Sequence, residues 1–155
     1  VYACINLSEV FHQGSHLRAA LKTWHYMLGL AVFPLVCARL AVHLAGRVPR
    51  IDPDPPGWQQ LSAKAVHAVL YALMIAMPLL GWLILSAKGK PIPFFGFELP
   101  ALIGEGRVLE KLFKGIHEIG GTVGYFVIGL HAAAALFHHY VVRDNTLRRM
   151  LPVQD

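Results

Sequence analysis

The chain has few cysteines, few charged residues and no motif for covalent cofactor attachment. Its two cysteines, Cys4 and Cys37, lie in apolar runs, where a buried thiol behaves as a small hydrophobic side chain. No C-x-x-C-H motif occurs, which excludes covalent c-type haem, and no cysteine pair has the spacing of a metal site. The sequence shows no repeat and no low-complexity segment, and neither a basic start nor a cleavage motif is visible at its N-terminus.

Apolar residues make up most of the sequence. Of the 155 residues, 55% are hydrophobic and only 15% are charged, and the mean hydropathy is +0.50. This composition indicates an integral membrane protein, and the length allows one domain, residues 1–155. The net charge of +5 comes from Lys and Arg at the ends of apolar segments, so we do not expect nucleic acid as a partner.

Three apolar segments are long enough to cross a bilayer, which takes about 20 residues. They cover about residues 20–45, 58–86 and 111–142. Pro34 lies inside the first, where membrane helices tolerate proline because neighbours re-satisfy the backbone. Residues 1–7 are apolar but too short to cross, and Val1 is not a methionine, so we expect the remnant of a first helix. The predicted fold is therefore all-α, a transmembrane four-helix bundle with its first helix truncated at the N-terminus.

The connectors and their charges predict the orientation. Residues 47–57 (RVPRIDPDPPG) should form a stiff loop, and residues 87–107, rich in Gly, Pro and Phe, should form a loop at the membrane interface. One side of the membrane then collects seven basic residues, namely Arg39, Arg47, Arg50, Lys64, Arg143, Arg148 and Arg149. The other side collects five basic residues that are diluted by four glutamates. Because cytoplasmic loops carry the excess of Lys and Arg, we expect the first side to face the cytoplasm.

Four positions of the last apolar segment are spaced seven residues apart, which is nearly two helical turns. They are His117, Gly124, His131 and His138. All four share one stripe of the predicted helix, and ionisable side chains at membrane depth are costly and usually functional. His117 and His131 are separated by roughly 21 Å of helix rise, which suits two haems stacked across a bilayer core about 30 Å thick. Gly124, between them, gives clearance where ring edges would meet, with close helix packing as the alternative.

The second apolar segment repeats this pattern. His25 lies near its start, at the membrane depth of His117, because successive helices run antiparallel and this helix therefore runs in the same direction as the last one. A haem iron takes two axial imidazoles, so His25 and His117 make one complete site, with an ordinary interfacial histidine as the alternative for His25. Arg39 suits a partner for haem propionates or extends to the headgroups, and His43 is a second-choice ligand or charge partner. No histidine in the sequence matches His131 convincingly in depth and face.

The sequence around these residues resembles that of a known protein family. The segment from Gly124 to Pro152 resembles the bacterial di-haem cytochrome b561 family, and so do WHxxxG at Trp24–Gly29, ALxIAxPLxG at Ala72–Gly81, and His117-Glu118. The resemblance covers essentially the whole chain. It implies a four-helix bundle with two b-type haems in the bacterial inner membrane, multi-pass, with a cytoplasmic C-terminus.

The resemblance also implies ligands and a function. His25 and His117 would bind the haem nearer the outer face, and His131 would bind the inner haem together with a first-helix histidine upstream of Val1. Bis-histidine irons leave no open position, so the chemistry is outer-sphere electron transfer. The family implies an oxidoreductase that moves electrons from superoxide at the outer face to ubiquinone. The alternative is a haem b subunit that links a dehydrogenase or other donor to the quinone pool, although no docking extension or obligate protein partner is evident.

Further candidate residues lie at each membrane face. At the outer face, five basic residues would steer an anion and raise its on-rate by about 10-fold or more, although interfacial lysines look the same. They are Lys88, Lys90, Arg107, Lys111 and Lys114. At the inner face, the quinone candidates are His138, His139 and His67. His138 is favoured because it shares the stripe, with a propionate or headgroup contact as its alternative. A third hypothesis is a non-redox protein whose histidines bind another metal or line a proton path.

Overall fold

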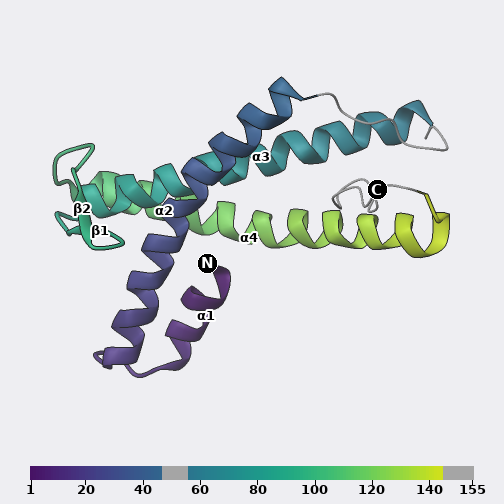
Figure 1. Cartoon of the computed structure of the whole chain (residues 1–155). Helices are drawn as coiled ribbons and strands as arrows, with labels where there is room; N and C mark the ends of the chain where they lie inside the picture. Colours follow the sequence, from purple (N-terminus) through teal and green to yellow (C-terminus); the bar gives the residue numbers. More distant parts are fainter. Residues whose placement is uncertain (47–55, 145–155) are drawn as a thin grey trace.

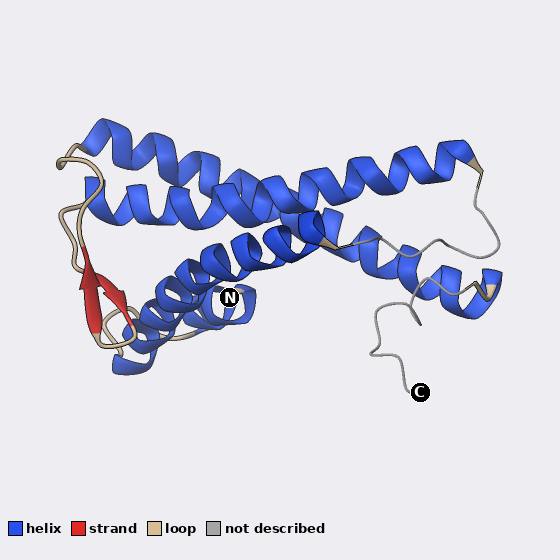
Figure 2. Cartoon of the chain, turned by 45° about the horizontal axis from the view of Figure 1, so that its top comes forward, coloured by secondary structure: helices blue, strands red, loops and turns tan. Residues whose placement is uncertain are grey.

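Helices make up most of the molecule (Figures 1 and 2). The computed structural model describes residues 1–46 and 56–144. The elements are α1 (Tyr2–Val10), α2 (His16–Ala45), α3 (Gly57–Ala87), β1 (Ile92–Phe94), β2 (Phe97–Leu99), α4 (Arg107–Phe137) and the π-helical turn η1 (His138–Val142). The predicted all-α helical bundle is confirmed, with α1 as its short first helix.

The long helices extend slightly beyond their predicted bounds. α2 begins at His16 rather than near residue 20, because the side-chain oxygen of Ser15 accepts a hydrogen bond from the Arg18 backbone N–H at 3.2 Å. α4 begins four residues before the predicted position, and α3 agrees to within one residue at each end. α2, α3 and the continuous segment Arg107–Val142 are each long and apolar enough to cross a membrane. The predicted connector 47–57 lies largely outside the described residues.

Each helix packs against the next helix in sequence, and the helices do not all surround one common axis. α3 and α4 lie side by side and antiparallel, α2 crosses α3, and the short α1 packs against α2 (Figure 1). The backbones of α2 and α4 have no Cα atoms within 8 Å of each other among the described residues. Helices in direct contact have axes about 8–10 Å apart and closer Cα atoms. A wide gap therefore separates α2 from α4.

The best-packed region lies where the β-hairpin meets α2 and α3. Leu30, Leu85 and Ile92 form a buried cluster. Four partly buried side chains pack against it, namely Tyr26, Trp82, Phe94 and Leu99. The Trp82 Nε1–H donates a hydrogen bond to the Pro100 carbonyl at 2.9 Å and ties the hairpin to α3. We call this region of the molecule the hairpin end.

The hairpin itself was not predicted. The segment 87–107 was expected to form a loop, but Ile92 pairs with Leu99 and Phe94 with Phe97 in antiparallel register. Phe95 and Gly96 both have positive φ values, 44° and 94°, as a tight type I′-like turn requires. Strands of three residues are too short to leave a period-two pattern in the sequence, so the loop interpretation missed them.

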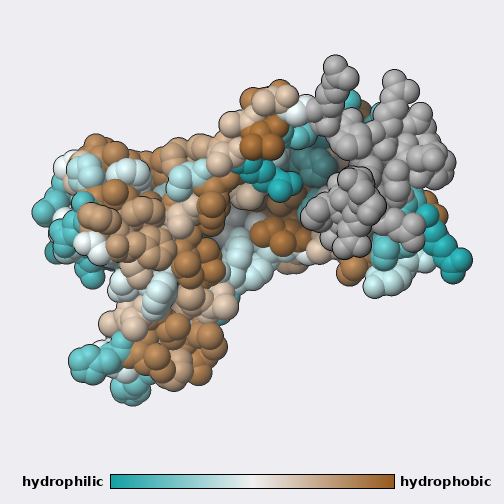
Figure 3. All heavy atoms as spheres, in the orientation of Figure 1, coloured by the Kyte–Doolittle hydropathy of each residue, from teal (hydrophilic) through white to brown (hydrophobic). Residues whose placement is uncertain are grey.

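The outer surface of the helices is apolar. In the most apolar window of each candidate span, only 11%, 11% and 6% of the residues are buried inside the protein. Hydrophobic atoms cover much of the helical body, and hydrophilic residues gather toward its ends (Figure 3). Side chains of this kind need lipid, a cofactor or another helix around them, which agrees with an integral membrane protein.

Candidate functional site

Two histidines from non-adjacent helices face each other across the gap between α2 and α4. The ring centres of His25 and His117 are 6.2 Å apart, and the ring planes are nearly perpendicular, at 80°. Two imidazoles that bind one metal ion from opposite sides, at about 2.0 Å from each nitrogen, have ring centres roughly 6 Å apart. The pair that the sequence predicts at one depth therefore has the separation that a shared metal ion requires.

The remaining ring nitrogens of this pair support the same interpretation. His25 Nδ1 lies 3.2 Å from the Val1 carbonyl, a contact that makes Nδ1 the donor and leaves Nε2 for a metal. His117 Nδ1 is buried and makes no hydrogen bond of ordinary geometry with the described residues, although the Met77 backbone lies near the ring. A Cβ added to Gly81 would lie 3.7 Å from His117 Cε1, so α3 presents a bare backbone beside this ring. These features fit a haem held between α2 and α4.

Gly124 leaves room for a side chain from α1. It is the one buried residue of α4, and a Cβ there would overlap the hydroxyl group of Tyr2. That hydroxyl donates a hydrogen bond to the Gly121 carbonyl at 3.0 Å, and Asn6 hydrogen-bonds to the Tyr125 hydroxyl one turn further along. The hydroxyl end of the Tyr2 side chain thus lies beside Gly124, in the space that the sequence analysis assigned to haem ring edges.

The second histidine pair involves a residue that the sequence did not place there. His131 was expected to have no matching histidine, but the ring centre of His67, from α3, lies 5.3 Å from its own, with an interplanar angle of 70°. This separation is shorter than the roughly 6 Å expected for two imidazoles that bind one metal ion from opposite sides. Arg39 and His43 lie close enough to interact electrostatically with His67, and His43 also stacks on Tyr71, with ring centres 6.5 Å apart. A polar cluster from α2, α3 and α4 therefore lies around His67, and His131 is part of it.

The predicted quinone-side histidines lie where α4 ends. His138 begins η1, and its Nδ1 lies 2.6 Å from Oδ2 of Asp144. The neighbouring His139 has a ring contact with Tyr140, with centres 4.8 Å apart, and the structure shows no carboxylate within 4 Å of it in the described part of the chain. Asp144 was missed by sequence reasoning, although an acidic residue six positions after a membrane histidine was a visible signal.

The five predicted steering cations are not equivalent. Lys88 contacts Glu110 at 2.9 Å and Lys114 contacts Glu118 at 3.5 Å, so each of these charges is largely matched by a carboxylate. The other three have no ion pair within 4 Å in the described ranges, namely Lys90, Arg107 and Lys111. An anion that approaches the hairpin end would meet those three as the stronger positive charges.

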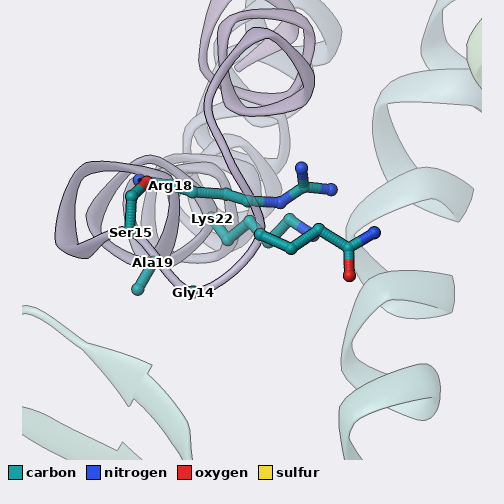
Figure 4. A pocket seen from close by; sticks show the side chains of 6 residues that line it. Gly14, Ser15, Arg18, Ala19 and Lys22 are labelled. Carbon is teal, nitrogen blue, oxygen red and sulfur yellow. Dashed lines mark hydrogen bonds between the residues drawn. The ribbon is translucent and has the colours of Figure 1, made fainter.

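A hollow of about 430 Å³ lies at the connector between α1 and α2. Its lining includes Arg18 and Lys22, which extend to the same side of the start of α2 (Figure 4). Both contact Glu9, at 2.9 Å and 3.8 Å, so their charge is already partly balanced. No group of three or more His, Cys, Asp or Glu side chains that could hold a metal ion occurs within residues 1–46 and 56–144.

The chain is similar in sequence to a known protein family and to several named proteins. Residues 3–153 match the family described as prokaryotic cytochrome b561. The chain is 39% identical over 151 residues to cytochrome b561 homolog 1 of Escherichia coli (strain K12), covering 97% of this chain and 86% of that protein. It is 39% identical over 132 residues to the probable superoxide oxidase CybB of Yersinia pestis, covering 85% and 75%. It is 34% identical over 110 residues to cytochrome b561 homolog 2 of Escherichia coli (strain K12), covering 66% and 58%.

Proposed function

The chain belongs to the prokaryotic cytochrome b561 family, and from this premise we propose that it is a di-haem enzyme that moves electrons from superoxide to a membrane quinone. The family is one of haem b proteins that transfer electrons, and this chain is an integral membrane protein with three candidate spans. The observation that carries the proposal is the facing pair His25 and His117, with the second histidine of α4, His131, fourteen residues further along the helix. A relative whose name is probable superoxide oxidase supports the choice of electron donor.

Histidines on two helices would hold the haem nearer the hairpin end. Haem b supplies an iron that gains and loses one electron at a time when it is bound. His25 from α2 and His117 from α4 would be its ligands, and the contact between His25 Nδ1 and the Val1 carbonyl keeps Nε2 of His25 available for this role. Two imidazole ligands leave no position for oxygen, which limits these residues to outer-sphere transfer. His131 would hold the inner haem with a first-helix histidine upstream of Val1, as the family resemblance implies.

The hairpin end is the donor side in this proposal. Lys90, Arg107 and Lys111 carry positive charge without an ion-pair partner in the part of the chain that the structure describes. Superoxide is a small anion, and a cluster of cations raises its local concentration and its on-rate. Electron transfer to this face converts superoxide to oxygen and leaves no proton for the protein to handle there.

The opposite end is the acceptor side. Reduction of a quinone to a quinol takes two electrons and two protons, so the acceptor site needs a group that gives protons. His138 is the first candidate, because it lies at the end of α4 beyond His131 and is part of a hydrogen-bonded pair. We place this end at the cytoplasmic face of the bacterial inner membrane, because the excess of basic residues predicts that the C-terminus lies there.

A superoxide pulse tests the proposal directly. The purified haem-loaded protein is exposed to a pulse of superoxide, and the haem absorption bands are followed in a stopped-flow spectrometer with and without ubiquinone-1. We expect rapid haem reduction, followed by reoxidation only when the quinone is present, and superoxide dismutase should abolish the reduction. Haems that stay oxidised after the pulse but accept electrons from a chemical reductant would favour the electron-transfer subunit. A colourless protein without a Soret band would refute both haem functions.

A further inference from the structure

The chain folds back on itself directly after α4. The helix continues into the π-helical turn η1, and Arg143 then takes a left-handed conformation with φ of 60°. This reversal brings Asp144 back to His138: its backbone N–H donates to the His138 carbonyl at 3.3 Å, and its carboxylate lies 2.6 Å from His138 Nδ1. The Asp144 side chain is 4% exposed and that of His138 is 26% exposed. The reversal therefore brings a buried carboxylate to a partly accessible imidazole.

The contact with Asp144 fixes which ring nitrogen of the His138 imidazole carries the proton. A buried carboxylate is costly unless it is paired or hydrogen-bonded, and the Nδ1–H of His138 is one such partner. With Nδ1 as the donor to Asp144, Nε2 is the ring nitrogen left for other chemistry. When the imidazole carries a second proton, that proton is on Nε2. A base or acid oriented by a carboxylate in this way is the usual arrangement of a side chain that transfers protons.

The neighbouring histidine provides an internal contrast. His139 is adjacent in sequence and similarly half-buried, but its recorded contact is with the ring of Tyr140 rather than with a carboxylate. Nothing in the described part of the chain fixes which of its nitrogens carries a proton. The two histidines that the sequence could not distinguish are therefore different in the folded chain.

We propose that Asp144 is a positioning residue that holds His138 as the proton donor to the quinone at the acceptor end; this inference rests on the proposed function. Two superoxide anions lose one electron each and become oxygen. The quinone would take up these two electrons together with two protons to become a quinol. His138 gives one proton from Nε2 and recovers it from water at that face. The second proton comes from the same imidazole after it has been reprotonated.

The acceptor half-reaction can be measured without superoxide. The haem-loaded protein is reduced with a limited amount of dithionite, mixed with ubiquinone-1 in a stopped-flow spectrometer, and haem reoxidation is followed in H₂O and in D₂O. We expect His138→Gln to slow reoxidation by about 100-fold, within the range that a general acid contributes, and Asp144→Asn to slow it by about 10-fold. Asp144→Glu, which keeps the charge, should recover part of the rate. His12→Gln, the same substitution in the α1–α2 connector, serves as the matched control and should leave the rate unchanged.

A double-mutant comparison separates positioning from simple structural support. If Asp144 acts through His138, the variant carrying both His138→Gln and Asp144→Asn should be no slower than His138→Gln alone. If Asp144 only supports the fold, Asp144→Asn should have a lower melting temperature, and its reoxidation rate per haem and solvent isotope effect should stay at the wild-type values. That result would overturn the inference, and so would a larger loss of rate in His139→Gln than in His138→Gln. If the wild-type haems are not reoxidised by the quinone, the proposed function falls as well.

Discussion

Replacing Gly124 with alanine should destabilise the protein although alanine is the better helix former. A Cβ at position 124 would overlap the Tyr2 hydroxyl and break its hydrogen bond to Gly121. Loss of that bond costs about 1 kcal/mol, and forcing extra volume into a packed contact costs about 1–3 kcal/mol. The gain in helix propensity offsets about 1 kcal/mol. The net destabilisation is therefore about 1–3 kcal/mol.

The same helix offers a matched control for this prediction. A Cβ added at Gly129 would have no neighbouring atom within 4 Å, so Gly129→Ala gains propensity without a clash and should stabilise the protein by up to about 1 kcal/mol. For a chain of this size, a change of 1 kcal/mol moves the melting temperature by about 2–4 °C. We expect Gly124→Ala to melt about 2–12 °C below the wild type and Gly129→Ala slightly above it.

The assay is thermal unfolding of the detergent-solubilised protein, followed by intrinsic tryptophan fluorescence. Removing the Tyr2 hydroxyl should relieve the overlap, so Gly124→Ala combined with Tyr2→Phe should melt close to Tyr2→Phe alone. Equal shifts for Gly124→Ala and Gly129→Ala would refute the packing argument. A large loss of haem from Gly124→Ala at unchanged melting temperature would instead return Gly124 to the clearance role.

Three further predictions concern the haem sites and the donor face. His117→Ala should remove one haem and leave the second largely in place, measured as the haem-to-protein ratio; an unchanged ratio would refute the ligand assignment. His67→Gln should leave the ratio unchanged, because the 5.3 Å ring separation from His131 is too short for a bridging iron; a loss of one haem would identify His67 as the missing ligand. Lys111→Glu should slow haem reduction by superoxide by about 10-fold at low salt and less at high salt, whereas Lys114→Glu should have a smaller effect because Glu118 already balances Lys114; equal effects would contradict this ranking.

The helices and the first histidine pair could be predicted because both follow from local periodicity. Apolar runs longer than about 20 residues predict spans, and because successive spans run antiparallel, residues near the start of α2 lie at the depth of residues near the start of α4. This shared depth is sufficient to pair His25 with His117, whose rings do face each other. The boundaries were less accurate because a single cap, such as Ser15, moves the start of a helix by a turn.

The contacts around the other histidines could not be predicted in this way. The neighbour of His131 depends on how α3 is rotated and tilted against α4, and the sequence of α3 gives its apolar content but not its rotation. The reversal that brings Asp144 to His138 depends on a π-helical turn and one left-handed residue, neither of which has a reliable sequence signature. The filling of the space at Gly124 likewise depends on a tyrosine 122 positions earlier in the chain, at residue 2.

The sequence by itself determined that this protein lies in a membrane, how many long helices it has and which histidines share a stripe, because apolar length and helical period are properties of single segments. Only the tertiary structure decided which side chains meet across helices. It separated α2 from α4 by a gap in which His25 and His117 face each other, and it put Tyr2 where a glycine of the stripe left room. These outcomes depend on the crossing and rotation of whole helices, which are set by packing between segments far apart in the chain.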